Sequence, residues 1–282
     1  MWARDGGNLM NHDLKKNGNS GPMVVTKDEV TIRADGRDGL GHPLDYHVLN
    51  QMIKDEMAAG RKLIRVEGVL GQRYIGATAS REYLRIEVYG TPGNNLGAFL
   101  NGTNIEVFGN GQDLTGNTMN SGRIIVHGSV SDVTGLAARG GEILIKDSAG
   151  YRTGIHLKEF KGSGPSIIIG GRVGDYLGEY MAGGTILVLG LEISDRPIIG
   201  QHIGAGMHGG RMYIMGDVRP QQLAPGASLK DVNLSDRKEI ERLIVNFEDT
   251  FGVSVKVDWR KFNKIVPASS RPFGGYYDKT MI

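Results

Sequence analysis

Glycine recurs at a fixed interval through the middle of this chain. A spacing of nineteen residues separates Gly97, Gly116, Gly135 and Gly154, and the series extends across short insertions to Gly178, Gly204 and, on the other side, Gly76. The chain has 44 glycines in 282 residues, about twice the usual share of about 7%. A period of nineteen is too short for a helix pair or a propeller blade. The spacing therefore favours a solenoid built from very short units.

Each unit contains one short apolar strand. Pairs of apolar residues follow the glycines and align once insertions are allowed, and they are Ile105/Val107, Ile124/Val126, Ile143/Ile145, Ile167/Ile169, Ile186/Val188 and Met212/Ile214. One strand cannot bury its own apolar face, so successive units must stack. We predict a β-dominated fold, a single-stranded parallel β-helix of about seven coils. These pairs would line its interior, and glycine would occupy corners that need a positive φ or a close backbone approach.

Two amphipathic helices flank the repeats and are predicted to cap the solenoid. The first, in residues 44–57, ends at Gly60. The second, in residues 235–251, has Ser235 and Asp236 as candidate N-caps and Gly252 as its stop. The predicted organisation is a flexible leader at 1–29, an N-terminal cap with its helix at 30–62, the β-helix at 63–216, and a C-terminal helix and tail at 217–282.

An apolar column is predicted on the outer side of the stacked strands. Strand alternation points the residue between two interior positions outward. After Glu106, these outward residues are Ile125, Leu144, Ile168, Leu187 and Tyr213, which we call the outer stripe. An exposed apolar stripe of this size marks a contact. Two occupants stay open: the chain's own C-terminal helix, or a partner subunit, for which these five residues would be the interface.

The absence of cysteine excludes several kinds of chemistry. A chain with no cysteine has no thiolate nucleophile, no cysteine-bound iron–sulfur cluster and no zinc ribbon. Its 33 basic and 31 acidic residues are nearly balanced, and no long run of like charge indicates a nucleic-acid partner. The sequence has no apolar stretch of the length of a membrane span and no signal-peptide pattern, so we expect a cytoplasmic protein.

Three further patterns are explained by structure. The segment GAGMHG at 204–209 matches G-x-G-x-x-G, but a strand is predicted after it where a dinucleotide site needs a helix. The seven histidines show no metal-ligand spacing. Asp113, Asp132 and Asp175 precede corner glycines, where aspartate bonds to nearby backbone. We predict no catalytic, cofactor-binding or metal-binding residue, and keep a polysaccharide-cleaving β-helix and a free-standing binding module as minor alternatives.

Several segments together resemble a known family. They are GQRYIGA, GTPGNNLGAF, GNTMNSG, GYRTGIHLK, GEYMAGGTILVLGL and GAGMHGGRMYIMG. In this order they resemble the GXGXG domain of glutamate synthase, most closely its stand-alone archaeal-type form. The likeness runs from Val30 to Arg219, and the closing IVPASSRPFGG is similar to the family's C-terminal tail. Related β-helices form the C subunit of formylmethanofuran dehydrogenase and occur in complexes similar to N-methylglutamate synthase.

The resemblance implies a right-handed β-helix beside the working parts of an oxidoreductase complex. In that family an amidotransferase with an N-terminal cysteine releases ammonia, and a barrel with FMN and a cysteine-bound iron–sulfur cluster consumes it. Because this chain has no cysteine, we expect both activities, the FMN and the cluster on partner subunits, and a structural role here. The alternative is a β-helix subunit of a formylmethanofuran dehydrogenase-like or N-methylglutamate synthase-like complex. The electron donor, the stoichiometry and self-association stay open.

Overall fold

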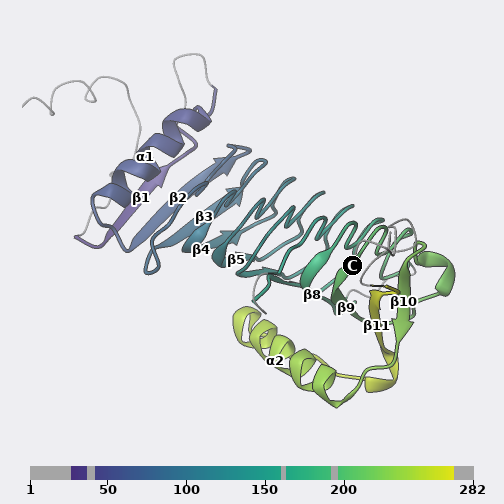
Figure 1. Cartoon of the computed structure of the whole chain (residues 1–282). Coiled ribbons are helices and arrows are strands. Elements are labelled where there is room, and N and C mark those ends of the chain that lie inside the picture. Colours follow the sequence, from purple (N-terminus) through teal and green to yellow (C-terminus); the bar gives the residue numbers. More distant parts are fainter. Residues whose placement is uncertain (1–26, 37–41, 160–162, 192–195, 270–282) are drawn as a thin grey trace, which may run out of the picture.

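The computed structural model describes residues 27–36, 42–159, 163–191 and 196–269, which form a rod of stacked strands (Figure 1). The strands are β1 (Glu29–Arg33), β2 (Leu63–Leu70), β3 (Arg85–Thr91), β4 (Asn101–Phe108), β5 (Ser121–Val126), β6 (Glu142–Ile145), β7 (Ser166–Ile169), β8 (Ala182–Val188), β9 (Gly209–Met215), β10 (Ala227–Lys230) and β11 (Phe262–Pro267). The helices of the described residues are α1 (Tyr46–Ala58), α2 (Leu234–Phe251) and the short 3₁₀ helices η1 (Pro220–Gln222) and η2 (Trp259–Lys261).

The strands from β1 to β9 pair in chain order, and every one of these pairs is parallel. This pattern confirms the predicted parallel β-helix. The solenoid has about six turns, slightly fewer than the seven predicted. The last corner glycine, Gly204, leads into β9, whose outer neighbour is the antiparallel strand β11 and not a further coil.

The corner glycines are required by both backbone conformation and packing. Gly116 has a φ of 72°, and a Cβ added there would lie 2.5 Å from the Cδ1 atom of Ile143 in the next coil. Gly97 is placed in the same way against Ile124. The corners from Gly76 to Gly178 therefore contact the interior ladder of the coil that follows each of them, which explains why the glycine spacing predicts the apolar pairs.

Helix α1 covers the N-terminal end of the rod (Figure 1). Its side chains Leu49 and Ile53 are fully buried with Val30 and Ile32 of β1 in the interior core. The Asp45 carboxylate caps the helix by accepting from the backbone N–H of His47. The first coil is thus closed by the predicted cap helix, while the predicted leader lies mostly outside the described residues and Glu29 already belongs to β1.

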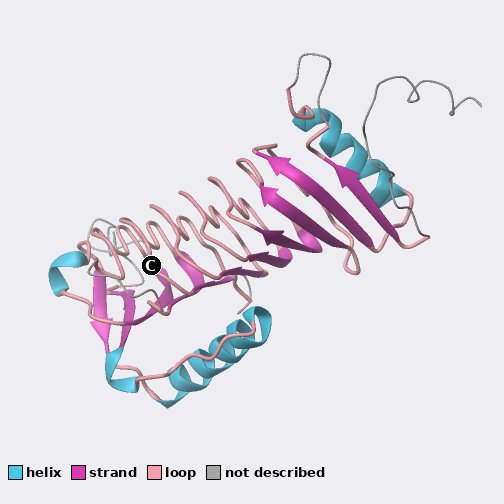
Figure 2. Ribbon diagram, turned by 180° about the vertical axis from the view of Figure 1, so that it is seen from behind, coloured by secondary structure: helices cyan, strands magenta, loops and turns pink. Residues whose placement is uncertain are grey.

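Helix α2 lies along the side of the rod, under the strands, and does not cap an end (Figures 1 and 2). It begins one residue before the predicted start, because Asn233 is the N-cap and forms a capping box with Asp236. The predicted N-caps Ser235 and Asp236 are therefore wrong, although Asp236 takes part as the third helical residue. Gly252 ends the helix with a φ of 62°, as predicted.

The C-terminal end is closed by two antiparallel strands that the sequence did not indicate. Strand β11 lies between β9 and β10 and is antiparallel to both. It therefore pairs with the open edge of the last parallel strand, which would otherwise expose unpaired backbone groups. The segment 217–269 thus contains two strands as well as the predicted helix, and α2 is the connection between them.

Candidate interaction surface

The outer stripe is covered by the chain's own helix. Its residues are stacked neighbours in register, from Ile125 through Leu144 and Ile168 to Leu187 and Tyr213. All are fully buried except Ile125, which is partly buried. The side chains of α2 that complete this second core are Ile240, Leu243, Ile244 and Phe247. Of the two molecules predicted to cover the outer stripe, the structure shows the chain's own helix α2. A partner would reach these side chains only if α2 moved away.

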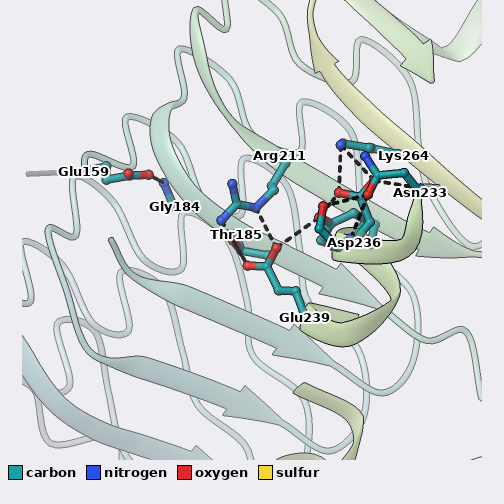
Figure 3. A network of polar contacts seen from close by, with 10 residues as sticks. Glu159, Gly184, Thr185, Arg211, Asn233, Asp236, Glu239 and Lys264 are labelled. Atoms are coloured by element: carbon teal, nitrogen blue, oxygen red, sulfur yellow. Dashed lines mark hydrogen bonds and ion pairs between the residues drawn. The ribbon is translucent and has the colours of Figure 1, made fainter. Parts of the chain in front are cut away.

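A polar network fastens the N-terminal turn of α2 to the rod (Figure 3). The hydroxyl of Tyr213 donates to Asp236 at 2.8 Å and lies 3.0 Å from a carboxylate oxygen of Glu239. The ammonium of Lys264, on β11, contacts both carboxylate oxygens of Asp236, at 2.7 and 2.9 Å. One buried carboxylate of α2 therefore joins the helix to both β9 and β11.

The charges in this network are set by their partners. Burial alone would raise the pKa of Asp236, but hydrogen bonds from Lys264, from the Asn233 backbone and from Tyr213 hold that pKa below its ordinary value. Burial and the neighbouring carboxylates raise the pKa of Tyr213 far above its usual range. The tyrosine therefore stays a neutral donor and Asp236 a charged acceptor, which is the combination that the geometry requires.

A second set of contacts runs along the edge of α2. Glu239 accepts from Thr185 at 3.0 Å and from Arg211 at 3.1 Å, and further along Asn246 accepts from Arg123 at 2.7 Å. Burial opposes the charge on Arg211, but Glu239 outweighs it and raises the pKa of the guanidinium. A cavity of about 310 Å³ adjoins these groups. Among its charged walls, Glu142, Arg211, Glu239 and Arg242 are engaged in contacts between α2 and the strands, and Glu159 accepts from the backbone of Gly184.

The first coils present a charged outer face that α2 does not cover. The outward residues of β2, β3 and β4 are Arg65, Glu87 and Glu106, the positions that the outer stripe occupies further along. Arg65 lies 3.0 Å from Glu87, and Arg85 bridges Glu87 and Glu106. The outward face therefore changes from paired charges to apolar residues at β5, where the cover by α2 begins.

A different face of the rod carries an unusual backbone conformation. All thirteen non-glycine residues with positive φ in the described chain lie either two residues before or two residues after a corner glycine. Only Gly206 replaces a side chain at these positions with glycine. A left-handed conformation costs a non-glycine residue about 1–2 kcal/mol. The chain thus keeps side chains at corners where glycine would relieve strain.

These positions form a continuous surface, which we call the corner ridge. It consists of the residues two before, one after and two after each corner glycine, namely Tyr74, Ala77, Thr78, Asn95, Ala98, Phe99, Leu114, Asn117, Thr118, Val133, Leu136, Ala137, Arg152, Ile155, His156, Tyr176, Glu179, Tyr180, His202, Ala205 and Gly206. All but Asn95 and Ala98 are exposed or partly exposed. The loops of successive coils line the side of the rod away from α2 (Figures 1 and 2).

Stacked rings order the C-terminal end of the corner ridge. The rings of Tyr176 and His202 stack with centroids 4.8 Å apart, and those of His156 and Tyr180 with centroids 5.0 Å apart. The guanidinium of Arg152 lies 4.7 Å from the centre of the Tyr176 ring. Such contacts hold flat side chains in fixed orientations. At the other end, an open cavity of about 440 Å³ lies between α1 and the first corner, at Tyr74.

The structure places the glycines and aspartates of two patterns noted in the sequence. Gly204 and Gly206 lie at a coil corner, and Gly209 begins β9. Asp132 accepts from the backbone N–H of Tyr151 at 2.8 Å, and Asp113 and Asp175 bond to the next coil in the same way. Within the described ranges, no three histidine or acidic residues gather as metal ligands. No described helix is long and apolar enough to cross a membrane.

The comparisons to known proteins show the family of this chain. The GXGXG motif family matches residues 61–268, so this chain belongs to that family. The match extends beyond the glycine repeats and includes β10, α2 and β11. The chain is also 43% identical over 243 residues to uncharacterized protein MJ1350 of Methanocaldococcus jannaschii, an alignment that covers 83% of this chain and 93% of that protein.

Proposed function

We propose that this chain is a non-catalytic structural subunit of a glutamate synthase-type complex in the cytoplasm. The observation that carries the proposal is the GXGXG family match along the rod, from residue 61 to residue 268, in a chain that contains no cysteine. The amidotransferase nucleophile and the iron–sulfur ligands of such an enzyme are thiolates, so other subunits must supply them. FMN and the cluster belong to those partners.

The rod suits the task of holding two enzymes in a fixed relation. Its strands are linked by an unbroken ladder from β1 to β9 and continue into β11 and β10, so that contacts at its two ends cannot move independently. Fixed spacing matters when one subunit releases ammonia and another consumes it, because an intermediate that escapes into water is lost. In this proposal the rod contributes rigidity and surface, and its partners contribute the chemistry.

The test is to purify the tagged full-length chain from the organism that encodes it and to identify what co-elutes. We expect a flavin-containing protein, visible by its absorbance of blue light, and an amidotransferase, both in fixed ratio to the chain. Glutamine-dependent formation of glutamate from 2-oxoglutarate by the purified complex would identify the reaction. A chain that elutes alone, or with partners that lack flavin, would refute the proposal.

A further inference from the structure

Beyond its first corner, which lies beside α1, the corner ridge is an apolar face that no described element covers. The other apolar face, the outer stripe, lies beneath α2. The ridge has large apolar or aromatic side chains at six of its seven corners, with Tyr74, Phe99, Leu114, Leu136, Ile155 and Tyr180 as examples. Phe99 is 52% exposed and Tyr180 is 48% exposed. An uncovered apolar surface that continues along the rod indicates a contact with another molecule.

The ridge is preorganised for such a contact. Its side chains are attached to corners whose backbone is fixed by hydrogen bonds between successive coils, such as Phe99 N–H to Asn117 C=O at 2.8 Å and Ala137 N–H to Ile155 C=O at 2.9 Å. The stacked rings at Tyr176 and Tyr180 restrict side-chain rotation further. Groups that are already ordered lose little entropy on binding. The residues two before and two after the corner glycines keep a strained, left-handed backbone. Such strain is often found at binding sites.

The size of the ridge fits a protein partner. Stacked strands repeat about every 4.8 Å, so seven corners extend over about 30 Å. The ridge has three positions at each corner, and a standard protein–protein interface uses about 20–30 residues on each side. The surface is therefore large enough for a specific complex without help from the covered stripe.

The charges of the ridge restrict the chemistry of that partner. Its only charged residues are Arg152 and Glu179, which pair at 2.9 Å, and His156 and His202 are the exposed imidazoles beside them. A guanidinium has five donors, so burial of Arg152 needs acceptors from the partner in addition to Glu179. The complementary surface is apolar along most of its length, with carboxylate or carbonyl oxygens opposite Arg152.

A second copy of this chain fits that description poorly. Two rods that overlap along their full length in opposite directions would pair about the coil of Gly135. That alignment sets the coil of Arg152 against the coil of Leu114, and the coil of Glu179 against that of Phe99. The corner of Leu114 also carries Asn117 and Thr118, but the side-chain oxygen of Asn117 already accepts from the Thr118 hydroxyl, and its amide donates to Asn95. The charged pair would then be buried with few new acceptors, which is unfavourable.

We propose that the corner ridge is the docking surface for a different protein, one subunit of the flavin-containing complex. This inference rests on the proposed function and adds to it the face of the rod that the partner occupies. The partner presents an apolar strip to the coils from Tyr74 to Ile155 and oxygen acceptors to the end at Arg152. Helix α2 stays on the outer stripe when the complex forms.

Matched substitutions test the proposal in the tagged full-length chain. We expect Phe99→Glu and Tyr180→Glu each to reduce recovery of one partner subunit at least tenfold. Tyr83→Glu and Val245→Glu are the controls, because Tyr83 is 89% exposed and Val245 is 52% exposed, and both lie outside the ridge. These controls should change recovery less than twofold. A circular dichroism spectrum and melting curve for each variant separate lost binding from lost folding.

Radical footprinting provides a readout that needs no variant. In the isolated chain Tyr74, Phe99 and Tyr180 should be oxidised readily, and in the purified complex they should be protected while Tyr83 stays reactive. If the ridge variants keep every subunit, the ridge proposal fails and the proposed function stands. If the wild-type chain recovers no flavoprotein, both fail. Protection of the ridge in the isolated chain would also overturn the ridge proposal. Light scattering would then tell whether the protected chain is a monomer or a homodimer.

Discussion

A charge placed beneath α2 should release the helix and leave the rod folded. Leu187 lies on the outer side of β8 and is fully buried. Its chain neighbours Ile186 and Val188 belong to the separate interior core. We therefore expect Leu187→Asp to damage the contact with α2 without disturbing the interior ladders, because the two cores share no side chain at this position.

The expected magnitude follows from burial. Truncation of a buried leucine to alanine costs about 2–5 kcal/mol, and an unpaired buried carboxylate costs several kcal/mol more. A combined loss of about 5 kcal/mol or more is comparable with the whole stability of a domain, about 5–15 kcal/mol. The four α2 side chains that face the stripe cannot offset a loss of this size, so the helix should detach.

Hydrogen exchange measured by mass spectrometry distinguishes the outcomes. Peptides from residues 234–251 should exchange rapidly in Leu187→Asp, while peptides from β4 and β8 stay protected. In a Trp2→Phe background, the fluorescence of Trp259 should shift to the red, because Trp259 packs against Phe262 in the same core. Val245→Asp, on the exposed side of α2, should leave both signals unchanged. Equal protection of α2 in Leu187→Asp and wild type would refute the assignment of the stripe to internal packing.

Three further predictions address the network and the corners. Folding lowers the pKa of Asp236 from 3.8, so the contribution of this carboxylate to stability should be complete above pH 3.8 and be lost as the pH falls further. In urea titrations across the acid range, Asp236→Asn should remove this part of the pH dependence. Gly116→Ala should lower the free energy of unfolding by about 2–4 kcal/mol through strain and overpacking. Gly226→Ala, at a position with a positive φ but no atom within 4 Å, should lower it by about 1–2 kcal/mol. Adding Ile143→Val should recover part of the loss from Gly116→Ala, and no recovery would contradict the packing explanation. Asp132→Ala should cost about 0.5–1.5 kcal/mol, because the Tyr151 N–H loses its acceptor at a site that water can reach. Asp132→Asn should cost less, and equal melting temperatures for the two variants would argue against that bond.

The sequence predicts well the features that are repeated in every coil, because each coil needs the same residue type at the same place. A corner glycine is needed because the next coil's isoleucine occupies the space of a Cβ, as Gly116 and Ile143 illustrate. The period therefore predicts the stacking, the interior ladders and the outward direction of the stripe. Both helices also follow from periodicity, since each buries one apolar face.

The parts that the sequence did not predict depend on a single contact between distant segments. Strand β11 forms because the last coil leaves an unpaired edge, and its residues Phe262–Pro267 match no column of the repeat. Asp236 and Lys264 are ordinary surface types in the sequence, and only the path of α2 brings them together at β9. The corner ridge did leave a signal, because the alignment that identifies the glycines also places apolar residues beside them in nearly every coil.

The two apolar faces of the rod differ in whether the chain itself covers them. On the strand face, the outward position is charged at Glu87 and Glu106 and becomes apolar at Ile125, where α2 begins to cover it. The outward residues therefore become apolar at the same coil at which α2 begins to cover them, so α2 accounts for the apolar character of that face without a partner. On the corner ridge, apolar side chains continue past the cover, and several of them, such as Tyr74, Phe99 and Leu114, stand at positions where a left-handed backbone makes a side chain costly. Interior packing does not require them, since they point away from it. The outward positions of a solenoid vary freely unless something contacts them, and so the ridge is where a partner should be sought.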